Sequence, residues 1–310
     1  CPAGNQDWYA AASELQLDYD REVGTGRDAT IYFKDVPILY SPWMNFSLNG
    51  QRKSGLLAPT FGSTSRSGLE LTVPYYWNIA PNMDATLATR VLSKRGVQLN
   101  TELRYLDKDY AGIARVELLP DDQQRKENRY GVSLLHTQQL AGGLTGAINF
   151  NRVSDDHYYT DLSSRIGNTS QRQLLQQGLL TYGGGWWFAT ANVQGYQTLR
   201  PDDSKLEDPY RLLPQLTLIA RQPELMGMET SFLGQYTSFA HKDLAKPEAR
   251  RAVLYPQLAL PHVTPGWYVT PKLGLHATYY AFDRQAEGVP NTVSRTVPIV
   301  SVDSDRQSVV

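Results

Sequence analysis

The side chains best suited to chemistry stand together in Asp155-Asp156-His157, where two carboxylates precede an imidazole. Such groups bind metal ions or exchange protons, but a metal centre needs three or four converging ligands. The run lies in a polar segment without a second ligand pair at useful spacing, and His136, His241, His262 and His276 are scattered along the chain. We therefore expect neither a metal site nor a catalytic centre.

Other chemical signatures are equally weak. Gly183-Gly184-Gly185 precedes Trp186-Trp187 and no helix, so it indicates a turn and not a phosphate-binding loop. No G-x-S-x-G element is present in the sequence. The net charge of -1 and the pI of about 6.6 provide no basic surface for nucleic acid. We expect a non-enzymatic protein that needs no cofactor and binds no nucleic acid.

The sequence pattern predicts that the chain is built from β-strands. Between residues 67 and 104 the side chains change character at every second position, which predicts paired antiparallel strands with one apolar and one polar face. The apolar set is Leu69, Leu71, Val73, Tyr75, Trp77, Met83, Ala85, Leu87, Val91, Val97, Leu99 and Leu103.

The same pattern continues as a meander of long strands. Most are 9 to 14 residues long, more than the usual 5 to 6 and suited to tilted strands that cross a bilayer. The predicted strands are 55–63, 67–79, 83–93, 96–106, 111–119, 129–138, 144–153, 172–182, 186–199, 210–220, 227–239, 251–260, 267–282 and 293–301.

Connections and aromatic residues favour an outer-membrane barrel. Short connections such as 80–82 alternate with long polar ones such as 154–171, and aromatic pairs such as Trp186 and Trp187 cluster near strand ends. No apolar run approaches the roughly 20 residues of a membrane-spanning helix. We expect an all-β, antiparallel transmembrane barrel. A general diffusion porin and a soluble β-rich binding module are the alternatives.

The beginning of the chain predicts a different unit. Residues 13–20 and 27–40 are expected to be strands joined by a turn at Gly24-Thr25-Gly26, as at the end of a small β-domain. Residues 41–54 contain Pro42 and an Asn49-Gly50 turn, which is typical of a junction. We place the domain boundary near residue 45, giving units of 1–45 and 46–310.

Several runs resemble a known family. They are DVPILYSPWMNF, RKSGLLAPTFG, GLELTVPYYWNIAPNMDATL, SKRG and ELRYL, and the match is densest over residues 14–106. These runs resemble LptD (OstA/Imp), the lipopolysaccharide-assembly proteins of the Gram-negative outer membrane. The resemblance implies that residues 1–45 are the last strands of a periplasmic β-jellyroll and that the remainder is the first part of a very large barrel. The chain then corresponds to an internal fragment.

The resemblance also implies function and partners. Members of the family translocate lipopolysaccharide and insert it into the outer leaflet of the outer membrane. The implied partners are the LptE lipoprotein as a plug in the barrel, the periplasmic bridge protein LptA on the jellyroll, lipopolysaccharide itself and outer-membrane lipids. The N-terminal part of the chain is expected in the periplasm.

Two prolines lie inside predicted strands. Pro59 and Pro74 cannot donate a hydrogen bond to a neighbouring strand, and such prolines are normally confined to edges and bulges. In the family that the chain resembles, prolines at matching positions belong to a lateral gate between the first and last barrel strands. The alternative is that both prolines mark bulges or strand ends without a role in transport.

Cys1 is the only cysteine, so its thiol is free or pairs outside this chain. The resemblance implies an interdomain disulfide to a cysteine near the C-terminal end of the barrel, which this chain lacks. An unpaired thiol without a role is the alternative.

Polar residues on the predicted strands form an inner wall that could contact LptE or the passing saccharide, or simply hold a hydrated surface of paired charges. Arg52 and Lys53 at the junction are candidates for binding lipid phosphates. The predicted wall residues are Glu70, Thr72, Asn78, Asp84, Arg90, Gln98, Asn100, Glu102 and Arg104.

Overall fold

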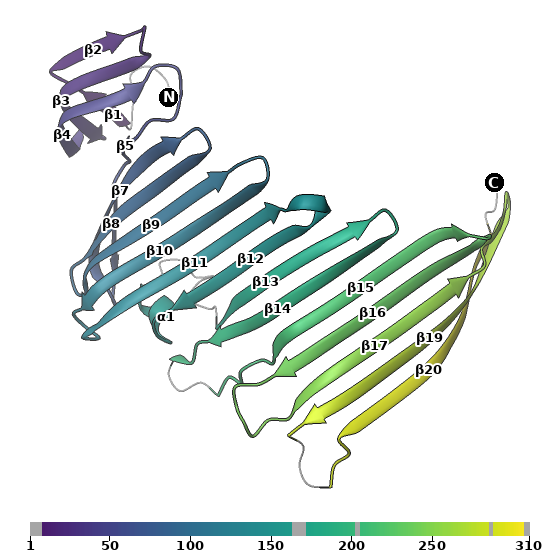
Figure 1. Ribbon diagram of the computed structural model, residues 1–310. Coiled ribbons are helices and arrows are strands. Elements are labelled where there is room, and N and C mark those ends of the chain that lie inside the picture. Colours follow the sequence, from purple (N-terminus) through teal and green to yellow (C-terminus); the bar gives the residue numbers. More distant parts are fainter. Residues whose placement is uncertain (1–7, 163–171, 202–204, 285–287, 307–310) are drawn as a thin grey trace.

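The protein consists of two antiparallel sheets, of four and sixteen strands, that follow one another along the chain (Figure 1). The computed structural model describes residues 8–162, 172–201, 205–284 and 288–306. In the first sheet the strands are β1 (Trp8–Ala11), β2 (Glu14–Asp18), β3 (Val23–Phe33) and β4 (Val36–Ser47). In the second they are β5 (Gly55–Leu56), β6 (Thr60–Thr64), β7 (Gly68–Ala80), β8 (Met83–Leu92), β9 (Gly96–Leu106), β10 (Tyr110–Asp122), β11 (Glu127–Gln139), β12 (Thr145–Val153), β13 (Gln173–Gly184), β14 (Trp187–Thr198), β15 (Arg211–Leu225), β16 (Met228–Ala240), β17 (Glu248–Ala259), β18 (His262–Thr264), β19 (Trp267–Asp283) and β20 (Thr292–Arg306).

The first sheet corrects one sequence prediction. The predicted turn at residues 24–26 lies inside β3. Strands β2 and β3 are joined by a turn at residues 19–22, and a further turn at Lys34 and Asp35, whose φ angles are +49° and +65°, follows β3. Gly24 is required for packing: a Cβ atom there would lie 2.2 Å from the Phe46 ring of β4. The predicted strand 27–40 is therefore two strands, β3 and β4, and β4 continues to Ser47, past the predicted boundary.

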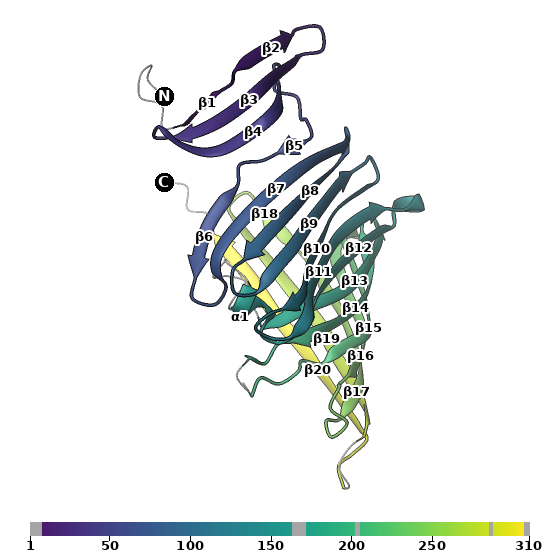
Figure 2. The same ribbon diagram turned by 90° about the vertical axis from the view of Figure 1, so that its left-hand side faces the viewer.

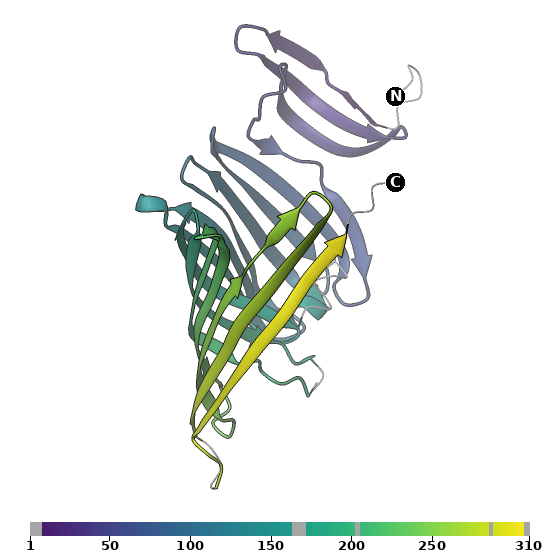
Figure 3. The ribbon, with the colours of Figure 1, turned by 90° about the vertical axis from the view of Figure 1, so that its right-hand side faces the viewer.

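The second sheet is the predicted up-and-down meander. From β7 to β17 each strand pairs with the next in antiparallel register, and β17 pairs with β19 and β19 with β20. The predicted strand 55–63 is interrupted and forms β5 and β6, while the short β18 had not been predicted. Figures 2 and 3 show that the sheet is twisted and curved. Among the described residues no pairing joins β20 to β6, so the sheet is open.

The connections of the sheet lie on two rims. The proximal rim, beside the first sheet, holds the short turns near residues 80–83, 106–110 and 139–145. The distal rim, at the other end of the strands, holds the long connections, including residues 154–172. Because hairpins alternate between two ends, the predicted alternation of short and long connections becomes an asymmetry between the rims.

The two faces of the sheet differ in chemistry. The inner face, defined as the face that the short helix α1 (Tyr158–Leu162) covers, carries polar pairs such as Asp84 with Arg104. The outer face exposes large apolar side chains, including Tyr75, Trp77 and Leu218. No described helix is long and apolar enough to cross a membrane.

One hairpin is only partly joined to its neighbours. Strands β13 and β14 pair along their whole length, from Gln173 with Thr198 to Gly184 with Trp187. Backbone pairing of β13 with β12 stops at Gln176 and Phe150, so both strands diverge toward the distal rim. The side chain of Gln197 bridges the gap: its oxygen accepts from the Val153 N–H at 2.9 Å and its amide donates to the Val153 carbonyl at 2.8 Å.

Candidate functional site: an interrupted seam and the inner wall

The seam between β5/β6 and β7 is interrupted at the two prolines that the sequence singled out. Strand β5 pairs Leu56 with Tyr75, and β6 resumes by pairing Thr60 with Thr72. Residues 57–59 therefore oppose residues 73–74, so the outer strand contains one extra residue, as in a β-bulge. Pro59 ends the break and Pro74 faces it.

Few hydrogen bonds cross this break. Among the described residues, the Leu57 N–H donates to the Pro74 carbonyl at 2.9 Å, and neither proline has an N–H to add another bond. On its other side Pro74 pairs with Ala88 of β8 within a continuous ladder. The structure thus brings Pro59 and Pro74 to one weak point of the sheet. A structural bulge and a gate would both have this geometry.

The linker before β5 is attached to the inner face near the proximal rim. The Arg52 guanidinium donates to an Asp84 carboxylate oxygen at 2.9 Å and to the Pro81 carbonyl. Asn78 of β7 donates its backbone N–H to Ser54 Oγ at 2.9 Å and its side-chain amide to the Arg52 carbonyl at 3.0 Å. These bonds fix residues 52–54 immediately before the interrupted seam.

Asp84 is the centre of this attachment. Its side chain is 5% exposed and also accepts two hydrogen bonds from Arg104, at 2.8 and 2.9 Å, and one from the Tyr76 hydroxyl at 3.0 Å. A buried carboxylate is stable only when its charge and hydrogen-bonding capacity are matched in this way. Arg52 was predicted to meet lipid phosphates and is paired with Asp84, whereas Lys53 lies beside it and is partly buried. Binding of phosphate at the junction stays a prediction.

The predicted wall residues share the inner face, as the register of β7, β8 and β9 requires. Most are paired with one another or with neighbouring strands: Arg90 with Glu70 at 2.6 Å, and Arg115 of β10 with Glu102 at 2.7 Å. Each pair joins opposite charges across adjacent strands, which stabilises the register. Most polar and charged side chains on the inner face of β7, β8 and β9 therefore have hydrogen-bond or ion-pair partners within the protein.

A second charged cluster, absent from the sequence predictions, holds α1 on the distal end of the inner face. Arg129 of β11 is fully buried and donates two bonds to Asp155, at 2.7 and 2.8 Å. It also pairs with Asp122 at 3.1 Å and with Asp161 at 3.0 Å. Arg95 pairs with Asp122 at 2.6 Å. The sequence had shown Asp155 only as a loop carboxylate, because its partners lie on strands far away in the chain.

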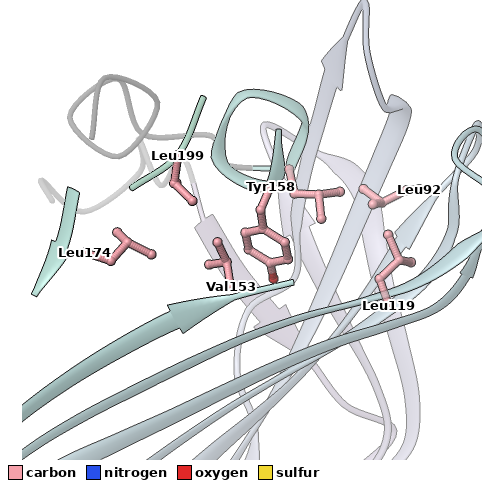
Figure 4. Close-up of a cluster of buried hydrophobic side chains, with 7 residues drawn as sticks. Leu92, Leu119, Val153, Tyr158, Leu174 and Leu199 are labelled. Carbon is pink, nitrogen blue, oxygen red and sulfur yellow. The ribbon is translucent and has the colours of Figure 1, made fainter. Parts of the chain in front are cut away.

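Apolar contacts complete the attachment of α1. Tyr158 packs in a buried cluster whose residues come from α1, from β8, β10, β12 and β13, and from the residue that follows β14, as Figure 4 shows. Its hydroxyl donates to a Glu117 carboxylate oxygen at 2.6 Å, and burial raises the pKa of Tyr158. The cluster consists of Leu92, Leu119, Val153, Tyr158, Leu162, Leu174 and Leu199.

The ionisation of Asp155 depends on this packing. Burial alone would raise the pKa of Asp155, but hydrogen bonds from Arg129 and Ser154 together with the Arg129 charge hold that pKa below its usual range. Asp155 is thus a structural ion-pair partner. Among the described residues no group of three potential metal ligands comes together. Cys1 lies outside the described residues.

The comparisons with known proteins decide the family. The profile of LptD, described as "LPS transport system D", matches residues 127–307. The chain belongs to the LptD family. A second profile, described as "LptD protein", matches residues 25–181 and so includes the first sheet from β3 onward.

LptD proteins of several bacteria resemble the chain over nearly all its length. A protein of Aromatoleum aromaticum named LPS-assembly protein LptD is 50% identical over 306 residues, which are 98% of this chain and 38% of that protein. Proteins of the same name from Azoarcus sp. and Ralstonia nicotianae are 49% and 43% identical, again over 98% of this chain and 38% of their own length. The chain spans about 38% of the length of these LptD relatives.

Proposed function

We propose that this chain is part of an LptD protein that translocates lipopolysaccharide and inserts it into the outer leaflet of the Gram-negative outer membrane. Pro59 and Pro74 would form part of a lateral gate. The observation that carries this proposal is the interruption between β5 and β6, where both prolines meet at a point with few hydrogen bonds. Membership of a family whose relatives are named LPS-assembly proteins supports the substrate.

The physical argument concerns the passage of an amphiphile. Lipopolysaccharide must move its acyl chains into lipid while its sugars follow an aqueous path. A continuous wall prevents this, because every backbone group in lipid must be hydrogen-bonded to a neighbouring strand. A seam with missing bonds opens at lower cost than its neighbours do, so the interruption at Pro59 would loosen the first barrel strands beside a lateral gate between the first and last strands.

The remaining assignments follow from the same proposal. The outer face would contact membrane lipid, since it exposes Tyr75, Trp77 and Leu218, and the inner face would enclose the LptE plug. The first sheet would lie in the periplasm and continue a jellyroll that contacts LptA. We also propose that Cys1 forms an interdomain disulfide and that the protein is not an enzyme. A diffusion porin would share the polar inner face but has no need of an interrupted seam.

The test replaces both prolines in the complete protein. In Pro59→Ala/Pro74→Ala the restored N–H groups can add up to two backbone hydrogen bonds of about 1 kcal/mol each, which lowers the open population of the seam about tenfold or more. We expect delivery of lipopolysaccharide to the cell surface, measured by labelling intact cells, to fall several-fold.

Pro256→Ala is the matched control, because Pro256 lies within β17 away from this seam. Normal delivery by the double variant, at normal protein abundance, would show that the prolines are structural bulge residues only.

A further inference from the structure

The inner face contains a hollow at the proximal rim that the family assignment leaves unexplained. Its volume is about 680 Å³, and it extends across β8 to β13 behind the linker. Two guanidinium groups, of Arg52 and Arg104, lie at its edge beside Asp84. The turn of the β7–β8 hairpin, at Pro81 and Asn82, closes one side.

The edge of the hollow has unused capacity to bind an anion. Arg52 and Arg104 bring two positive charges and Asp84 one negative charge, while Glu102, 4.0 Å from Arg104, is bonded more closely to Arg115 at 2.7 Å. The side chains of both arginines are about half exposed, at 51% and 52%. Their bonds to Asp84 and Pro81 use two of the five N–H donors of each guanidinium in the described structure. Asp84 holds both groups in fixed orientations, and guanidinium groups in such positions are well suited to phosphate.

The floor of the hollow is apolar, in contrast to most of the inner face. Leu106 and Leu135 line it and are 64% and 42% exposed, and Ile113 lies between them. These residues belong to the inner face because the register aligns Arg104 with Ile113 and Ile113 with Leu135. Exposed leucines on a wall that otherwise faces water indicate a surface for an apolar group.

We propose that this hollow binds the phosphorylated and acylated headgroup of an amphiphile. Arg52 and Arg104 contact the phosphate, and Leu106, Ile113 and Leu135 cover the first carbons of the acyl chains. This inference rests on the proposed function and deepens it: the hollow is a holding position one hairpin away from the interrupted seam. The complementarity of two cations and an apolar floor favours such a headgroup over a protein partner, whose contact surface would need larger apolar anchors.

The test measures binding to the complete protein in detergent together with its natural partners. The probes are an acylated disaccharide with two phosphates, the same molecule after removal of both phosphates, and phosphatidylglycerol. Arg52→Gln removes charge-assisted bonds, and we expect about tenfold weaker binding of the phosphorylated disaccharide. Its binding should recover in part in Arg52→Lys, while the dephosphorylated probe should bind equally to all three proteins.

Arg221→Gln is the matched control. Arg221 is an exposed inner-face arginine that is paired with Glu229, as Arg52 is with Asp84, but it lies on β15 outside the hollow. Loss of the Leu135 side chain in Leu135→Ser should weaken both disaccharide probes about equally. If Arg52→Gln also binds phosphatidylglycerol about tenfold more weakly, the hollow is a general phospholipid site. That result still supports the proposed phosphate and acyl chemistry.

Three results would overturn the inference: equal weakening by Arg221→Gln, no change in Arg52→Gln, or protection of the hollow by a bound partner protein that lipid does not displace. These results are separate from the fate of the gate. If Pro59→Ala/Pro74→Ala reduces delivery while Arg52→Gln binds normally, the proposed function stands and the holding site is rejected. If the proline variant delivers normally while Arg52→Gln binds weakly, the holding site stands and the role of the prolines in a gate is rejected.

Discussion

At the scale of residues, the charges that attach α1 account for much of the ordered structure on the distal rim. Arg129 and Asp122 are both fully buried, and each needs the opposite charges around it, including the other, to remain ionised. Their pairing is completed by Asp155 and Asp161 from the connection that carries α1. Arg129, which no sequence pattern singles out, thus has a large energetic role, because its partners come from β10 and from the connection that carries α1.

Replacing Arg129 should be strongly destabilising. In Arg129→Met the Asp155 carboxylate loses both of its bonds from Arg129, and Asp122 and Asp161 each lose one ion pair; breaking a buried ion pair costs about 3 to 5 kcal/mol. We expect the free energy of unfolding, measured by denaturant titration in lipid or detergent, to fall by about that amount. Arg221→Met removes an exposed ion pair with Glu229 and should change the free energy of unfolding by less than about 1 kcal/mol. Similar values for the two variants would contradict the ranking.

Acid should detach α1. The folded-state pKa of Asp155 lies below its unfolded value of about 3.9, so the stabilisation by ionised Asp155 is complete above that value and is lost as pH falls through the folded pKa. We expect the protection factors of the amides of residues 158–162, which compare the measured exchange rate with the intrinsic rate at the same pH, to be high at neutral pH and to fall below about pH 4. In Asp155→Asn this acid-dependent step should be absent, and a step that persists would assign it to another carboxylate.

At the scale of elements, the distal end of the β12–β13 seam depends on a side chain. Gln197 satisfies both backbone groups of Val153, which a neighbouring strand would normally do. In Gln197→Ala those buried groups lose their partners at a cost of about 1 to 3 kcal/mol. We expect faster hydrogen exchange at Val153, with little change at Phe150, where the backbone ladder is intact. The exposed Gln173 provides the control variant Gln173→Ala, which should leave Val153 protected.

The sequence predicted most elements because period-two alternation is a local property. Strands β7 to β17 follow the predicted ranges closely, since every second side chain along each of them faces the same side. The failures have nonlocal causes. Gly24 and Gly26 looked like turn residues, but both lie within β3, where the close approach of the Phe46 ring from β4 leaves no room for a Cβ atom at Gly24. The Gln197 bridge could not be predicted, because no local pattern shows where two strands diverge.

The candidate site was predictable to a similar extent. Pro59 and Pro74 could be identified because proline in a strand breaks a general rule, although only the structure places them at one interruption. The inner-face alignment of Asp84 with Arg104 follows from alternation and hairpin register. That Arg52 joins them could not be inferred, because a linker residue has no periodic pattern to fix its direction. The cluster around Arg129 was missed for the same reason.

At the scale of the whole molecule, the two sheets are connected through few residues. The chain leaves β4 at Ser47 and enters β5 at Gly55, and the bonds of Arg52 and Ser54 secure that linker to the β7–β8 hairpin. The hollow, the linker and the interrupted seam therefore occupy adjacent positions near the proximal rim. The long connections lie at the opposite rim, and α1 reaches from there to the first strands, since Arg90 of β8, which pairs with Thr72 of β7, donates to the Leu162 carbonyl at 2.7 Å.

The attachment of α1 also constrains the order of folding. The surface that receives it is assembled from Arg95, Asp122 and Arg129, which come together only after β8, β9, β10 and β11 have paired. Until then the carboxylates of Asp155 and Asp161 have no counter-charges and remain hydrated. Residues 154–162 must therefore dock after this part of the wall has formed. Their ordering indicates that β8 to β11 have already paired in the correct register.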